Sequence, residues 1–130
     1  MELKKILLRV SLVYTLLITI AFLLPASGKL NLFFFFNSSI PIDKVLHGII
    51  HLILAFLWLN FIFIQNNQVI KLKLIAITVL SCVVYGIIIE IFQEQFVDSR
   101  KADFLDIIAN SVGTLLGFLI FLKVKFRFNS

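Results

Sequence analysis

Charged side chains are scarce in this chain. They make up 15% of its 130 residues, whereas a typical soluble domain has about 25%. Hydrophobic residues reach 61%, and the mean hydropathy is +1.08. A chain so poor in charge lacks the polar surface that a soluble domain needs. The composition therefore disfavours a soluble globular protein and predicts a membrane protein.

Several chemical signatures are also missing. The single cysteine, Cys82, excludes an intrachain disulfide and leaves the redox compartment undefined. The sequence contains no serine–histidine arrangement, no phosphate-binding loop and no dinucleotide fingerprint. The pI near 9.6 is high enough for nucleic-acid binding. Because the basic residues lie at the ends of apolar segments, where they orient a membrane chain, we predict no nucleic-acid partner.

Four apolar stretches nearly fill the chain, at about residues 6–24, 44–64, 72–92 and 104–122. Each is close to the ~20 residues that a helix needs to cross ~30 Å of hydrocarbon. We therefore predict an all-α, four-transmembrane-helix bundle that forms a single membrane domain over residues 1–130. The first stretch is longer than the apolar part of a signal peptide, and no clear cleavage site follows it, so we interpret it as a span.

The distribution of basic residues predicts the orientation. Eight of them fall on one side of the predicted bundle: Lys4, Lys5, Arg9, Lys71, Lys73, Lys123, Lys125 and Arg127. The positive-inside rule then places both termini in the cytoplasm. In the first outer loop, the aromatic run from Leu32 to Phe36 is too short to span and predicts an interfacial or re-entrant segment.

Polar residues interrupt the apolar spans at their predicted outer ends. On the fourth span they recur at spacings of three and four, which keeps them on one helix face: Asp103, Asp106, Asn110, Gly113 and Gly117. The third span repeats the pattern with Gly86, Glu90 and Gln93, and the second contributes Asp43, Lys44, His47 and His51. Polar groups are costly in lipid, so they are expected to face other helices and mark a functional site.

Three kinds of chemistry suit these residues. Glu90 has the character of a general acid or base, oriented by His47 or Arg100. Arg100, Lys44 and the histidines together suit an anionic head group. His47 and His51, with carboxylates, would suit a metal, but there is no His-Glu-x-x-His motif, and we expect neither a metal nor another cofactor. A purely structural role, in which the amides join helices, also stays open.

The order of these motifs resembles a known family. The chain reads Asp43-Lys44-x-x-His47, then Tyr85-Gly86-x-x-x-Glu90-x-x-Gln93, then Arg100-x-x-Asp103-x-x-Asp106-x-x-x-Asn110-x-x-Gly113-x-x-x-Gly117. This set is similar to the VanZ-like membrane proteins and covers the second to fourth spans. One departure is the loop before the arginine, which often carries Pro-Gly and here reads Gln95 to Ser99. The resemblance implies a role related to teicoplanin resistance and no defined reaction.

The sequence thus predicts a bacterial inner-membrane protein with an outward-facing polar pocket. We expect the pocket to bind or protect an anionic envelope lipid or cell-wall precursor. The alternative is a membrane-embedded hydrolase or transferase in which Glu90 is the acid or base. The candidate catalytic residues are Glu90 and His47, the candidate ligand-binding residues are Asp43, Lys44, Gln93, Arg100, Asp103, Asp106 and Asn110, and the helix-packing residues are Gly86, Gly113 and Gly117. A proton-coupled exporter is disfavoured, because the inner halves of the spans contain almost no ionisable group.

Overall fold

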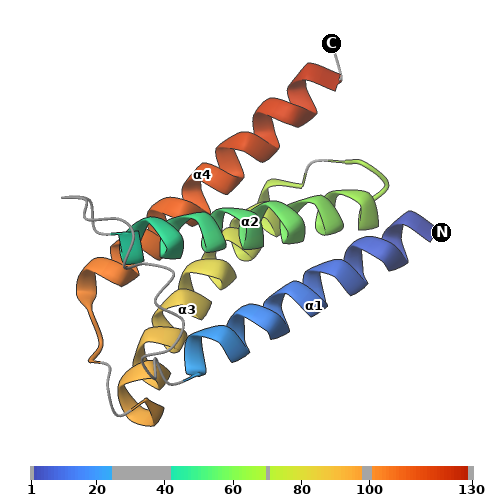
Figure 1. Ribbon diagram of the computed structural model, residues 1–130. Coiled ribbons are helices and arrows are strands. Elements are labelled where there is room, and N and C mark those ends of the chain that lie inside the picture. Colours follow the sequence, from blue (N-terminus) through green and yellow to red (C-terminus); the bar gives the residue numbers. More distant parts are fainter. Residues whose placement is uncertain (1, 25–41, 70, 98–100, 129–130) are drawn as a thin grey trace.

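The protein is built from four α-helices. The computed structural model describes residues 2–24, 42–69, 71–97 and 101–128, and these residues contain no strand. The helices are α1 (Glu2–Leu23), α2 (Ile42–Gln65), α3 (Leu72–Phe96) and α4 (Phe104–Phe128) (Figure 1). All four are long and apolar enough to cross a membrane. The prediction of an all-α, four-transmembrane-helix protein is confirmed.

The helices extend past the apolar stretches of the sequence. α1 begins at Glu2 rather than near residue 6, α3 ends at Phe96 rather than near residue 92, and α4 ends at Phe128 rather than near residue 122. The added turns carry charged and amide side chains, which lower hydropathy without breaking backbone hydrogen bonds. Long basic side chains there can reach the membrane–water interface.

The helices alternate in direction, so their ends form two groups. Figure 1 shows the start of α1, the α2–α3 turn and the end of α4 towards one side, and the four opposite helix ends towards the other. Lys4 confirms this grouping, because its Nζ donates to Asn67 Oδ1 at 3.2 Å in the α2–α3 turn. In that turn Asn67 and Gln68 have φ values of 53° and 63°, which reverse the chain.

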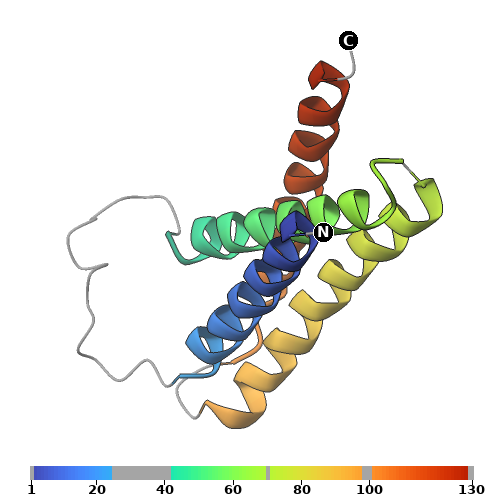
Figure 2. The same ribbon diagram turned by 90° about the vertical axis from the view of Figure 1, so that its right-hand side faces the viewer.

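α2 lies at the centre of the bundle. It packs against each of the other three helices and most extensively against α4. The C-terminal end of α4 points away from the other helices in Figures 1 and 2, but Phe121 on it still packs against Leu59, Phe63 and Ile75. The buried apolar side chains form one cluster from α1, α2 and α3, and a second from α2, α3 and α4 that lies towards the end of α2. We call the opposite group of helix ends, which contains the start of α2, the His47 end of the bundle.

The bundle has an apolar exterior and a partly polar interior. Large aliphatic side chains such as Leu17, Leu80 and Leu119 are more than half exposed. The interior, in contrast, contains buried polar side chains: Ser11, His47, His51, Glu90, Gln93, Asp106, Asn110 and Thr114. This reverses the usual pattern of a soluble protein and fits a bundle whose outer surface contacts lipid.

Glycines on α4 allow its backbone to lie directly against α2. A Cβ added at Gly113 would overlap the backbone of Gly48, and one at Gly117 would overlap the Leu52 carbonyl and lie 3.1 Å from Ala55 Cβ. Small residues permit this approach in membrane helices, where dispersion contacts between backbones drive association. The contact fixes the rotation of α4, and so decides which of its side chains face α2 and α3.

Candidate functional site

The candidate site lies at the His47 end, where polar side chains from three helices meet. His47 and Lys44 come from the first turns of α2, Glu90 from the last part of α3, and Asp106 and Asn110 from the start of α4. All but Lys44 are buried, and the Lys44 side chain is 23% exposed. The helix faces inferred from spacing therefore meet in the interior.

His47 is the centre of this cluster. Its Nδ1 lies 3.1 Å from Asn110 Oδ1 and 3.3 Å from Glu90 Oε1. Because both oxygens are acceptors, Nδ1 carries the hydrogen and donates it. Nε2, on the other side of the ring, lies 3.9 Å from Asp43 Oδ1. The ring of Phe22 on α1 packs over the imidazole at 4.8 Å between centroids. The His47 side chain on α2 thus contacts all three of the other helices.

Lys44 forms the rim of the site. Its Nζ donates to Asp103 Oδ2 at 2.5 Å and to Asp106 Oδ1 at 2.7 Å, which joins the start of α2 to the start of α4. Asp103 Oδ1 also accepts the backbone N–H of Leu105 at 2.8 Å, as an N-terminal capping residue does. The hydrogen bond from Lys44, supported by that from Leu105, holds the pKa of Asp103 below its usual value.

This lowered pKa makes the rim sensitive to acid. A carboxyl with a lower pKa in the folded state stabilises the fold above its unfolded pKa, and this contribution disappears as pH falls through the folded value. We therefore expect the bundle to lose stability below about pH 4, and Asp103→Asn to reduce that loss. Thermal unfolding of both proteins in detergent across this pH range would measure the difference. Equal acid sensitivity would show that Asp103 does not contribute.

The remaining sequence-predicted residues separate into two groups. Gln93 is buried and donates from Nε2 to the Phe22 carbonyl at 3.0 Å, so it attaches α1 to α3. His51 lies apart from the carboxylates: its Nδ1 bonds the His47 carbonyl at 3.1 Å, and its Nε2 has no hydrogen-bond partner among the described residues. The site therefore uses one histidine rather than two.

Gly86 brings α3 close to the cluster. A Cβ at this position would lie 3.0 Å from Asn110 Cβ and 3.0 Å from His51 Nε2. The missing side chain thus leaves room for the polar groups of the two neighbouring helices. Arg100, and the first outer loop with its predicted re-entrant segment, lie outside the described residues.

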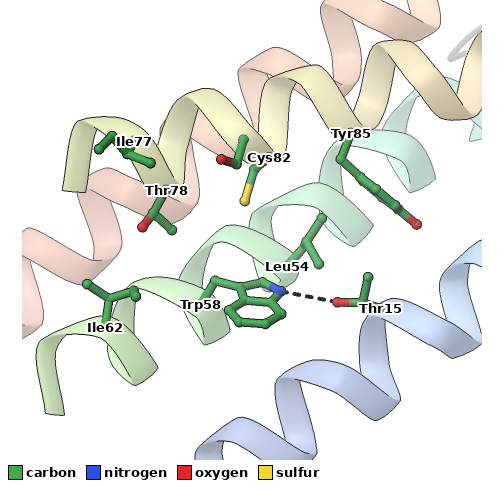
Figure 3. Close-up of a pocket in the computed structure, with 9 residues that line it drawn as sticks. Thr15, Leu54, Trp58, Ile62, Ile77, Thr78, Cys82 and Tyr85 are labelled. Carbon is green, nitrogen blue, oxygen red and sulfur yellow. Dashed lines mark hydrogen bonds between the residues drawn. The ribbon is translucent and has the colours of Figure 1, made fainter. Parts of the chain in front are cut away.

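A second polar region, which the sequence reasoning missed, lies between α1, α2 and α3. A cavity of about 350 Å³ opens there, and Figure 3 shows Thr15, Trp58, Cys82 and Tyr85 around it. Trp58 Nε1 donates to Thr15 Oγ1 at 3.1 Å, and the hydroxyls of Thr19 and Tyr85 share a hydrogen bond at 2.7 Å. The four-residue spacing of Thr15 and Thr19 on the first span was the available signal.

These features define a multi-pass membrane protein with an apolar exterior and a buried polar cluster that joins three helices. The chain belongs to the VanZ-like family: the family model described as VanZ/LLP1 matches residues 7–126. The match extends the resemblance from the second to fourth spans across nearly the whole chain. Neither the curated proteins nor the solved structures contain a significant match.

Proposed function

We propose that the His47 end of the bundle recognises the anionic head group of an envelope lipid or a lipid-linked cell-wall precursor. The positive-inside rule predicts that this end faces outward from a bacterial inner membrane, where such molecules are exposed. By binding the head group, the protein would protect it from a glycopeptide of the teicoplanin type. This role agrees with membership of the VanZ-like family.

The observation that carries the proposal is the burial of ionisable groups in a bundle with an apolar exterior. His47 and Glu90 are each 1% exposed, although they come from two different helices. Burying such groups costs several kcal/mol unless they are paired, and apolar residues would hold helices together at less cost. Their retention at one end favours a role in recognition over packing alone.

The charges of the described residues set a requirement for this function. The rim contains Asp43, Asp103 and Asp106, and Lys44 is held by two of them. These residues alone do not form a cationic surface. An anionic head group therefore needs a further positive charge, and Arg100 remains the candidate that the sequence supplies.

Glu90→Gln tests the proposal directly. We expect the full-length wild-type protein, purified in detergent, to retain an anionic lipid in native mass spectrometry, and Glu90→Gln to retain at least about tenfold less, equivalent to ~1.4 kcal/mol. The loss follows because the amide removes the charge that orients His47 at 3.3 Å. Reconstitution with phosphatidylglycerol or a polyprenyl phosphate separates a bulk lipid from a precursor-like one.

Glu94→Gln is the matched control, because Glu94 lies on the same helix and is exposed. This variant should retain as much lipid as the wild type. Equal retention by the Glu90 and Glu94 variants, or only zwitterionic lipid on the wild type, would contradict the proposal.

The second candidate is a membrane-embedded hydrolase or transferase that acts on the same head group. The observation that favours it is the close pairing of His47 Nδ1 and Glu90 Oε1, which is a common arrangement of a general acid–base pair. Incubation of the purified protein with the retained lipid distinguishes the two. Product formation with a pH profile that shifts in Glu90→Asp supports an enzyme, and binding without turnover supports recognition.

A further inference from the structure

We propose that Asp43, His47 and Asp106 bind a divalent transition-metal ion. Each of these residues offers one potential ligand atom, and the three atoms lie within 4.8 Å of one another. Asp43 and His47 are one turn apart on α2, whereas Asp106 comes from the first turn of α4. The ion would therefore bridge the two helices that make the most extensive contact in the bundle.

The orientation of the imidazole is the main argument for a cation. When Nδ1 donates its hydrogen to Asn110 Oδ1, a neutral ring has its lone pair on Nε2. Nε2 makes no hydrogen bond within the described part of the chain and faces the Asp43 carboxylate at 3.9 Å. In the neutral ring this lone pair faces a carboxylate, an arrangement that a positive ion between the two groups would stabilise, and 3.9 Å leaves room for one.

The aspartates alone would not require a metal. Both occupy the first turns of helices, where the helix dipole stabilises a carboxylate. The helix dipole does not account for His47. This residue is 1% exposed and directs a basic nitrogen towards the acidic group. The buried histidine thus adds to the two aspartates a nitrogen donor that helix capping does not explain.

The surroundings of the group match those of known metal sites. Histidines that bind metals usually donate their other N–H to a carboxylate or carbonyl, which fixes the tautomer and the ring orientation. Asn110 Oδ1 fills this role for His47, and Glu90 Oε1 lies 3.3 Å from the same nitrogen. Lys44 holds Asp106 through Oδ1 and so leaves Oδ2 for the ion. The Asp43 side chain is 56% exposed, which gives the site access to the aqueous phase.

The donor set indicates which metals fit. One imidazole nitrogen and two carboxylate oxygens suit Zn²⁺, Mn²⁺ or Fe²⁺, whereas Mg²⁺ and Ca²⁺ prefer sites made of oxygen alone. Three protein ligands leave at least one coordination position for an external group. A phosphate oxygen in that position would supply the attraction for an anion that the described rim lacks. This last link rests on the proposed function, whereas the metal site itself does not.

Titration of the full-length protein with Zn²⁺ in the absence of added lipid tests the site. We expect one Zn²⁺ per chain by isothermal titration calorimetry after chelator treatment, and a rise in the unfolding temperature because the ion binds only the folded state. Asp106→Asn and His47→Gln should weaken binding at least about 100-fold, and Glu90→Gln about 10- to 100-fold, as for other groups that orient a ligand.

Glu94→Gln is the matched control, because Glu94 is an exposed carboxylate near the same end of the bundle and lies outside the group of three. It should bind Zn²⁺ as the wild type does. Each variant is first shown to be folded by its unfolding temperature without metal. Failure of the folded wild type to bind Zn²⁺ or Mn²⁺ below millimolar concentrations would overturn the site, as would unchanged binding by both Asp106→Asn and His47→Gln. Zn²⁺ binding without lipid retention would support the metal site and reject only its link to the head group.

Discussion

Gly113→Ala should destabilise the bundle strongly, although it adds a single methyl group. The new Cβ would overlap the carbonyl oxygen, carbonyl carbon and Cα of Gly48. All three are backbone atoms, so no side chain can move aside, and α2 and α4 must separate. Overpacking of a core typically costs ~1–3 kcal/mol, and we expect this rigid contact to reach at least the upper end of that range.

The same contact supplies its own control. A Cβ at Gly48 would meet only the Ala109 carbonyl oxygen, at an ordinary 3.6 Å. Gly48→Ala is therefore the same chemical change on the opposite helix, and it should leave stability unchanged or slightly improved, because alanine favours the helix. Thermal unfolding in one detergent compares the two. Equal stability of both variants would show that α2 and α4 do not approach as described.

The four helices were predictable because a membrane span is recognised from its average hydropathy over about twenty residues. Each helix exceeds that length, so the segments could be read from composition despite errors at their ends. The ends of α3 and α4 were missed for a physical reason. Amide and basic side chains lower hydropathy but do not break a helix, and a helix continues until its hydrogen bonding or capping changes.

The site was predictable only as a set of helix faces. Spacing by three and four identified the inward face of α4, but it does not give the angle at which that face meets another helix. The residues of the site were therefore easier to predict than the contacts between them. His47 was one of two candidate partners of Glu90, with Arg100 as the other, and the structure places His47 Nδ1 3.3 Å from Glu90 Oε1.

The contacts of Lys44 at the rim show more clearly what the sequence could not predict. Lys44 was predicted to bind an anionic head group together with Arg100 and the histidines. The structure instead places it between Asp103 and Asp106, which are about sixty positions later in the sequence. The close contact of α2 with α4 at Gly113 and Gly117 brings these groups together; the sequence predicted these glycines as packing residues, but not the helix that they would meet.

Lys44→Met should destabilise the His47 end by about 1.5–3 kcal/mol, the range for a lost hydrogen bond to a charged group. The methionine keeps the length and the apolar part of the side chain, so the change isolates the ammonium. Its loss leaves Asp106, with a side chain that is 8% exposed, as a carboxylate without its lysine partner. Unfolding of the chelator-treated protein in detergent measures the effect without a contribution from bound metal.

A double-mutant cycle identifies which aspartate provides this energy. Adding Asp106→Asn to Lys44→Met should recover at least half of the lost stability, because the amide removes the charge that would otherwise be buried without compensation. Adding Asp103→Asn should recover little, since the Asp103 side chain is 44% exposed and water solvates its charge. If both aspartate changes recover stability equally, the difference in burial between Asp103 and Asp106 does not determine the stability of the rim. If neither does, the two ion pairs are not what joins α2 to α4.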